Sequence, residues 1–98
     1  MLTPSERSSP SALAARIHAE IAALEKPNTP NVRAVRVRYS RALKDAGPEL
    51  ILRLARILLK EYDLRWVAYE LIAEHDAAFA RLDAALVGGT NPGAALDI

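Results

Sequence analysis

The sequence contains no cysteine, and only five of its 98 residues are aromatic. Without cysteine, the chain can form neither disulfides nor a thiolate metal site, and it has no thiol nucleophile. No run of about 18 consecutive apolar residues occurs, so we expect no transmembrane helix. The polar start lacks the apolar core of a secretory signal, and we therefore expect a cytoplasmic protein that does not bind membranes.

Motifs that carry catalytic chemistry are also missing from the sequence. There is no P-loop, no dinucleotide-binding fingerprint and no Ser-His-Asp set. His18 and His75 lie far apart and neither has a second ligand at helical spacing, so we expect no metal and no cofactor. Glu70 and Glu74 form an acidic pair without a nucleophile beside them, and we interpret them as solvated. The residues alone give no case for an enzyme.

The residues that are abundant favour helices. Hydrophobic residues make up 51% of the chain, mostly Ala and Leu. Ser9-Pro10 and Thr29-Pro30 are helix-start signals, Pro48 begins another helix, and Asp63 and Asp76 are expected N-caps. The predicted helices run from Pro10 to a stop at Lys26, from Pro30 to Asp45, from Pro48 to Tyr62, from Leu64 to His75, and from Ala77 to Val87.

These helices predict an all-α fold of antiparallel hairpins. Four to five short helices joined by tight turns are typical of a short α-solenoid. Apolar residues cover most of the circumference of the helix at 48–62, which must therefore be covered on more than one side. We expect a flexible leader at 1–9, a helical domain at 10–87, and a flexible Gly/Pro-rich tail at 88–98.

Basic residues are concentrated on one predicted helix. The segment 28–47 has a net charge of +4, whereas the whole chain has +1, so the rest carries −3. At 100° per residue the basic side chains share the arc opposite the apolar one, with Arg38 at its margin. We therefore expect a solvent-side stripe that is either a solvated outer face or a surface for phosphates. Its members are Arg33, Arg36, Arg38, Arg41 and Lys44.

Two passages carry a resemblance to a known family. They are Asn-Thr-Pro-Asn-Val-Arg-Ala-Val-Arg at 28–36 and Leu-Arg-Trp-Val-Ala-Tyr-Glu-Leu-Ile-Ala-Glu-His at 64–75. The stretch 28–83 resembles the amino-terminal portion of the bacterial DNA alkylation repair family, which are HEAT-like-repeat DNA glycosylases. The resemblance implies a HEAT-like array and a role in DNA repair, with the basic stripe on the phosphates of double-stranded DNA. Five such contacts would give a slope of log K against log salt of about −4.5.

The resemblance does not supply a catalytic residue. The family's excision residues, a Trp and an Asp, lie on a helix beyond the matched stretch, so the domain at 10–87 is incomplete relative to the family. We therefore expect no glycosylase activity from this chain by itself. The alternatives are a helical protein-interaction or scaffold module, and a truncated fragment without function.

Trp66 and Tyr69 form a second apolar face on the predicted helix 64–75. They could stack on bases or line a lesion pocket. An aromatic pair at helical spacing more often packs against the next helix, and we predict packing here. If further helical pairs are missing, this face is exposed instead and available for self-association or a protein partner.

Overall fold

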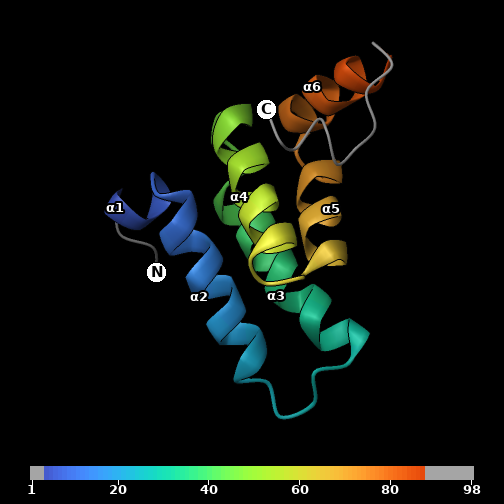
Figure 1. Ribbon diagram of the computed structural model, residues 1–98. Coiled ribbons are helices and arrows are strands. Elements are labelled where there is room, and N and C mark those ends of the chain that lie inside the picture. The colour runs from blue at the N-terminus through green and yellow to red at the C-terminus, as the bar shows by residue number, and fades with distance from the viewer. Residues whose placement is uncertain (1–3, 88–98) are drawn as a thin grey trace.

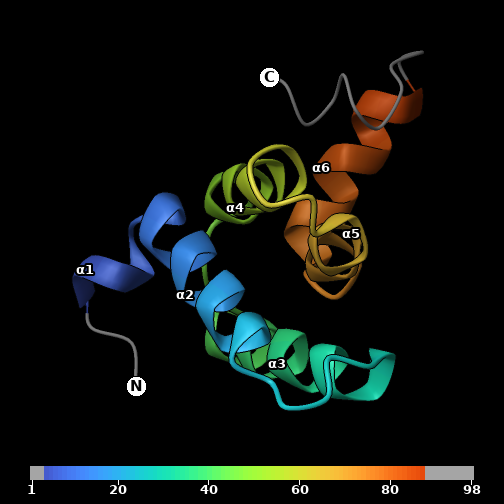
Figure 2. The same cartoon turned by 60° about the horizontal axis from the view of Figure 1, so that its bottom comes forward.

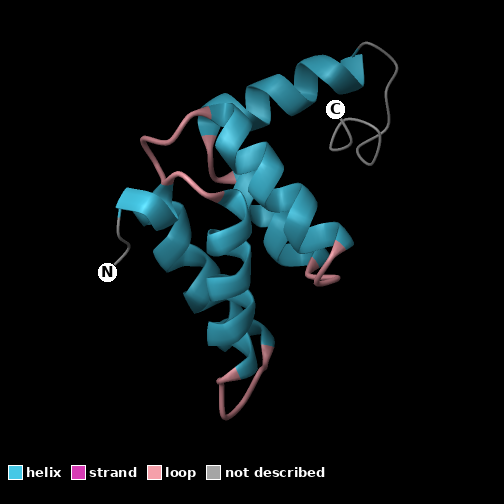
Figure 3. Cartoon of the chain, turned by 60° about the vertical axis from the view of Figure 1, so that its left-hand side comes forward, coloured by secondary structure: helices cyan, strands magenta, loops and turns pink. Residues whose placement is uncertain are grey.

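The computed structural model describes residues 4–87, and all regular secondary structure in this range is helical (Figure 1). This confirms the predicted all-α class. Figure 3 shows that only loops and turns join these helices. In the described part of the chain, no helix is long and apolar enough to cross a membrane. The helices are α1 (Pro4–Arg7), α2 (Pro10–Ala22), α3 (Thr29–Ala42), α4 (Pro48–Lys60), α5 (Arg65–Ala73) and α6 (Asp76–Val87).

The amino-terminal helix α1 contacts the end of α3. The short helix α1 falls within the segment 1–9 that we expected to be a leader. The Arg7 Nη2 group donates to the carbonyl oxygen of Ala42 at 3.2 Å, so α1 is connected to the end of α3. The tail predicted at 88–98 and the first three residues lie outside the described residues.

Side-chain caps fix the start of α2 and α3. The Ser9 hydroxyl accepts from the Ala12 N–H at 3.2 Å, and the Asn28 side chain accepts from the Asn31 N–H at 3.0 Å. A proline follows in the first turn of both helices, where its missing N–H has no intrahelical partner to lose. Ser9 is the predicted cap, but α3 begins one residue earlier than predicted, because Asn28 rather than Thr29 caps it.

Asp63 lies in the turn between α4 and α5 and does not cap α5. Its φ of 53° lies in the left-handed region, and the Leu64 N–H donates to the Leu58 carbonyl at 2.8 Å. This bond joins residues six positions apart and closes the turn between α4 and α5. The predicted N-cap role of Asp63 is therefore wrong, because its backbone makes the turn and Leu64 precedes α5.

Helix α4 lies at the centre of the molecule and is covered on several sides, as its apolar circumference predicts. It packs most extensively against α5 and α2, and it also contacts α6. Figure 1 shows α2 and α4 running in one direction and α3 and α5 in the other. In Figure 2, α3 lies to one side of the bundle, where it packs on α2 and α5. Within residues 4–87 no close backbone contact joins α3 to α4.

The core is built where these helices face one another. Its largest fully buried side chains come from α2, α4 and α5, together with the residue that follows α3. Burying one Leu or Ile side chain stabilises the fold by about 1.5–3 kcal/mol. The largest are Leu13, Ile17, Leu43, Ile51, Leu54, Leu58, Leu71 and Ile72.

His75 connects the start of α6 to the turn before α4. The imidazole is buried, its Nε2 lies 2.8 Å from the Ala46 carbonyl oxygen, and the Ala78 N–H donates to its Nδ1 at 3.2 Å. Because a carbonyl only accepts and a backbone N–H only donates, Nε2 carries the proton and the ring is neutral. His75 is thus the N-cap of α6, the role that the sequence suggested for Asp76.

Replacing His75 by Ala should lower the free energy of unfolding by about 2–3 kcal/mol. The substitution removes the cap of α6, leaves the Ala46 carbonyl without its donor, and opens a small cavity. Chemical denaturation followed by circular dichroism measures the loss.

Two variants control this result. His75→Asn keeps a side chain that can cap a helix but cannot reach Ala46, so its loss should be intermediate. His18→Ala removes an exposed imidazole that stacks on Tyr62 with ring centroids 4.6 Å apart, and should cost less than about 1 kcal/mol. Equal losses for His75→Ala and His18→Ala would contradict the assigned role.

Candidate nucleic-acid interface

The predicted basic stripe lies on α3 and in the turn after it, and four of its five members are exposed. The side chains of Arg33 and Arg38 are 54% and 63% exposed. Arg41 and Lys44 are also exposed, at the carboxyl end of α3. A phosphate could approach each of these four cations from solvent.

Arg36 departs from the prediction, because its side chain is only 7% exposed. Its Nε donates to Glu70 Oε1 at 3.3 Å and its Nη1 donates to Ser40 Oγ at 3.0 Å. The expected solvent-side position of Arg36 is therefore wrong. Helical periodicity places it at one edge of the stripe, and α5 packs on α3 along that edge.

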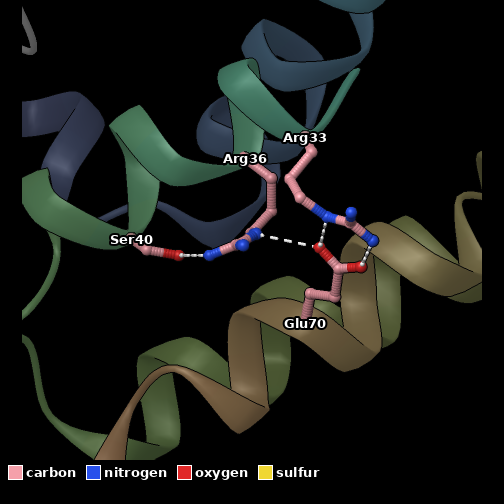
Figure 4. Close-up of polar contacts among 4 residues, drawn as sticks. All are labelled: Arg33, Arg36, Ser40 and Glu70. Carbon is pink, nitrogen blue, oxygen red and sulfur yellow. Dashed lines mark hydrogen bonds and ion pairs between the residues drawn. The ribbon is translucent and has the colours of Figure 1, made fainter. Parts of the chain in front are cut away.

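Glu70 on α5 binds two members of the stripe at once (Figure 4). Arg33 donates to both of its carboxylate oxygens, through Nε at 3.2 Å and Nη2 at 2.8 Å, while Arg36 donates to Oε1. The hydrogen bonds from Arg33 are the main cause that holds the pKa of Glu70 below its ordinary value near 4.5. Our interpretation of Glu70 as a solvated acid is therefore wrong: this carboxylate docks α3 on α5.

Glu20 on α2 likewise binds two side chains of α3 and docks α3 on α2. Arg38 donates from Nη2 to Glu20 Oε1 at 2.7 Å, and the Tyr39 hydroxyl donates to Glu20 Oε2. Burial, followed by the bond to Glu20, raises the pKa of Tyr39 to about 12. Burial also acts to raise the pKa of Glu20, but the hydrogen bonds from Tyr39 and Arg38 outweigh it and lower that pKa.

The carboxyl end of α3 keeps cations that the fold does not neutralise. Within residues 4–87, Arg41 and Lys44 form no ion pair. Arg7 brings a further guanidinium to this end through its bond to Ala42, a contact that the sequence did not reveal. The positive charge that is free to meet a ligand is therefore concentrated at the end of α3 rather than spread along it.

Trp66 and Tyr69 lie differently from each other. Tyr69 is half-buried and packs against the core, as predicted, but Trp66 is 75% exposed. The predicted packing of Trp66 is wrong, because α3, α4 and α6 pack on other faces of α5 and leave this side chain uncovered.

A groove runs between the amino-terminal turns of α3 and α5. Helix α3 contributes Val32 and Arg33 to its lining, and α5 contributes Trp66, Val67 and Glu70. Neither the stripe nor the aromatic pair indicates this groove in the sequence, because its two walls come from segments more than 30 residues apart. Among residues 4–87, the groove included, no group of three or more His, Asp or Glu side chains is placed to hold a metal ion.

No protein-family model matches this chain, and neither a curated protein nor a solved structure matches it. The candidate site consists of exposed cations on α3, two carboxylates that neutralise part of their charge, and a groove lined in part by the exposed indole of Trp66.

Replacing Glu70 by Gln should lower the free energy of unfolding by about 2 kcal/mol. The substitution leaves the Arg36 guanidinium buried without a counter-charge, which costs about 3–5 kcal/mol at fully buried pairs. Because the Glu70 side chain is 27% exposed, we expect solvent to reduce this cost. Glu74→Gln, a matched change at an exposed position one turn away, should change stability by no more than about 0.5 kcal/mol.

The same variant tests the pKa of Glu70. A carboxyl group whose pKa is lowered by folding stabilises the protein above its ordinary pKa, and this contribution is lost as the pH falls through the lowered value. Between neutral pH and pH 4.5 the wild-type protein should therefore keep this contribution, and below pH 4.5 it should lose it. Urea unfolding as a function of pH should show a smaller acid loss for Glu70→Gln, and parallel curves would contradict the assignment.

Proposed function

We propose that the chain is a DNA-binding helical domain with a role in DNA repair, which contacts the phosphates of double-stranded DNA through α3. The observation that carries the proposal is the exposure of four cations on one edge: Arg33, Arg38, Arg41 and Lys44. Contacts of this kind fix the position of the duplex but do not read its sequence. The proposal concerns binding, and it assigns no excision chemistry to these residues.

Ion pairing leaves the two paired members of this edge able to bind phosphate. Arg33 uses two of its five N–H donors on Glu70, so three remain. Exposed ion pairs contribute little to stability because solvent screens them, so a phosphate can share these guanidinium groups with the carboxylates. Arg36 is different, because it is buried and bonded to both Glu70 and Ser40. We therefore assign four phosphate contacts rather than the five of the original stripe.

The packing of the helices supports the resemblance to HEAT-like proteins. Helices α2, α3 and α4 each contact the next helix but one, and α2 with α3, and α4 with α5, are packed neighbours. Such contacts between helical pairs and their neighbours are what a helical-repeat array requires. We propose on this basis that α2–α6 form part of a HEAT-like array with α3 and α5 in one layer.

A second candidate function is a protein-interaction module that binds a partner through Trp66. The observation that favours it is the 75% exposure of this side chain, which is large for a tryptophan. Such a module would not need the cations at the end of α3. Neutralising those cations therefore separates the two candidates.

Binding to a short blunt duplex should depend on salt with a slope of log K against log salt of about −3.6, from four phosphate contacts. The double variant Arg41→Gln and Lys44→Gln should reduce the slope to about −1.8, because two contacts are lost. Fluorescence anisotropy with a labelled duplex at several salt concentrations measures both values.

The matched control is the double variant Arg53→Gln and Arg56→Gln, which removes the same charge from the exposed edge of α4. It should leave the slope near that of the wild type. Absence of binding, or binding that does not respond to salt, contradicts the proposal. Equal effects of the two double variants would mean that net charge rather than the α3 edge attracts DNA.

A further inference from the structure

The groove between α3 and α5 has both apolar and charged residues in its lining. Val32, Val67 and Trp66 are apolar, while Arg33 and Glu70 are charged. Its volume of about 490 Å³ lies in the range of small-ligand sites. Counting Arg36, the groove contains two guanidinium groups and one carboxylate, so it carries a net charge of +1. These properties suit a ligand that has both a flat apolar group and a negative charge.

Trp66 supplies the surface for the flat group. The indole is 75% exposed at the start of α5, and no described residue uses it in an aromatic pair. Exposed indoles beside cations are used by single-strand-binding proteins, because every base has a face that can stack. This kind of recognition needs no hydrogen bonds to the base edge.

Arg33 supplies a positive charge in the same groove. The Arg33 side chain is 54% exposed, and three of its N–H donors are not engaged by Glu70 (Figure 4). Glu70 holds the guanidinium in one place through two bonds, so the donors that remain are already oriented. A phosphate can therefore bind to Arg33 without disrupting the contact between α3 and α5.

We propose that this groove binds one unpaired nucleotide, with its base stacked on Trp66 and its phosphate on Arg33. The proposal rests on the proposed function, because Arg33 belongs both to the groove and to the α3 edge that holds the duplex. This shared residue favours a nucleic acid over a peptide with an aromatic and an acidic side chain. The ligand is then a duplex that continues into a single strand.

The geometry of α3 sets the length of that single strand. Arg33 and Arg41 are eight residues apart on one helix, which corresponds to a rise of about 12 Å. One strand advances about 3.4 Å per nucleotide, so this distance spans about three to four nucleotides. An overhang of about four nucleotides should thus reach from a duplex held at Arg41 and Lys44 to the indole of Trp66.

The experiment compares a blunt duplex with duplexes of the same number of phosphates that carry an overhang of about four nucleotides on the 3′ or the 5′ end. Trp66 is the only tryptophan in the chain, so intrinsic fluorescence reports on this residue alone. We expect one overhang polarity to quench the emission and to bind about tenfold more tightly than the blunt duplex. The blunt duplex should bind without quenching.

Variants separate stacking from phosphate contact. Trp66→Ala should abolish the preference for the overhang and leave binding to the blunt duplex unchanged, whereas Trp66→Phe should restore part of the preference. Phe79→Ala, the other exposed large aromatic at 52%, should keep the full preference. Because Trp66 is exposed, thermal melting should show the same stability for Trp66→Ala and the wild type.

The possible outcomes distinguish failure of the groove proposal from failure of the duplex interface. Binding of blunt and overhang duplexes with equal affinity and no quenching overturns the groove proposal and leaves the duplex interface standing. Quenching by a free oligonucleotide without any binding of the blunt duplex supports the groove and overturns the duplex interface. Absence of both signals overturns both proposals.

Discussion

The apolar circumference of α4 is the constraint on which the rest of the structure depends. A helix of this kind must be surrounded, and α2, α5 and α6 occupy the positions around it. Helix α3 is left at the side, with fewer apolar residues to bury, and it contacts α2 and α5 instead. Its attachment therefore relies on polar contacts as well as on Val35, Tyr39 and Leu43.

These polar contacts explain why the most basic helix of the chain can belong to a packed domain. Glu20 approaches α3 from α2 and Glu70 approaches it from α5, and together they neutralise part of its charge. Arg36 is bonded at the α3–α5 contact and contributes to the fold. Arg41 and Lys44 lie beyond both carboxylates, so their charge is available to a ligand. One helix thus contains arginines with structural roles and cations with a proposed binding role.

Local features of the fold could be predicted from the sequence, whereas contacts between distant segments could not. Ser9 with Pro10 specifies a helix cap within a few residues. The apolar pattern of α4 likewise predicts that other helices pack around it, although it does not show which ones. The burial of Arg36 depends on Glu70, which lies 34 positions further along the chain. Periodicity places Arg36 on an arc but does not show which helix lies against that arc. The same limit applies to Trp66, whose exposure depends on what covers the first turn of α5.

The imidazole of His75 has a consequence for local unfolding. One ring holds both the first turn of α6 and the carbonyl group of Ala46 in the turn before α4. If α6 detaches, that carbonyl loses its donor, and if the turn opens, the ring that caps α6 is no longer held in place. These two segments are 29 residues apart in the sequence. They should nevertheless open as one cooperative unit, and their backbone amides should exchange with solvent at a common rate.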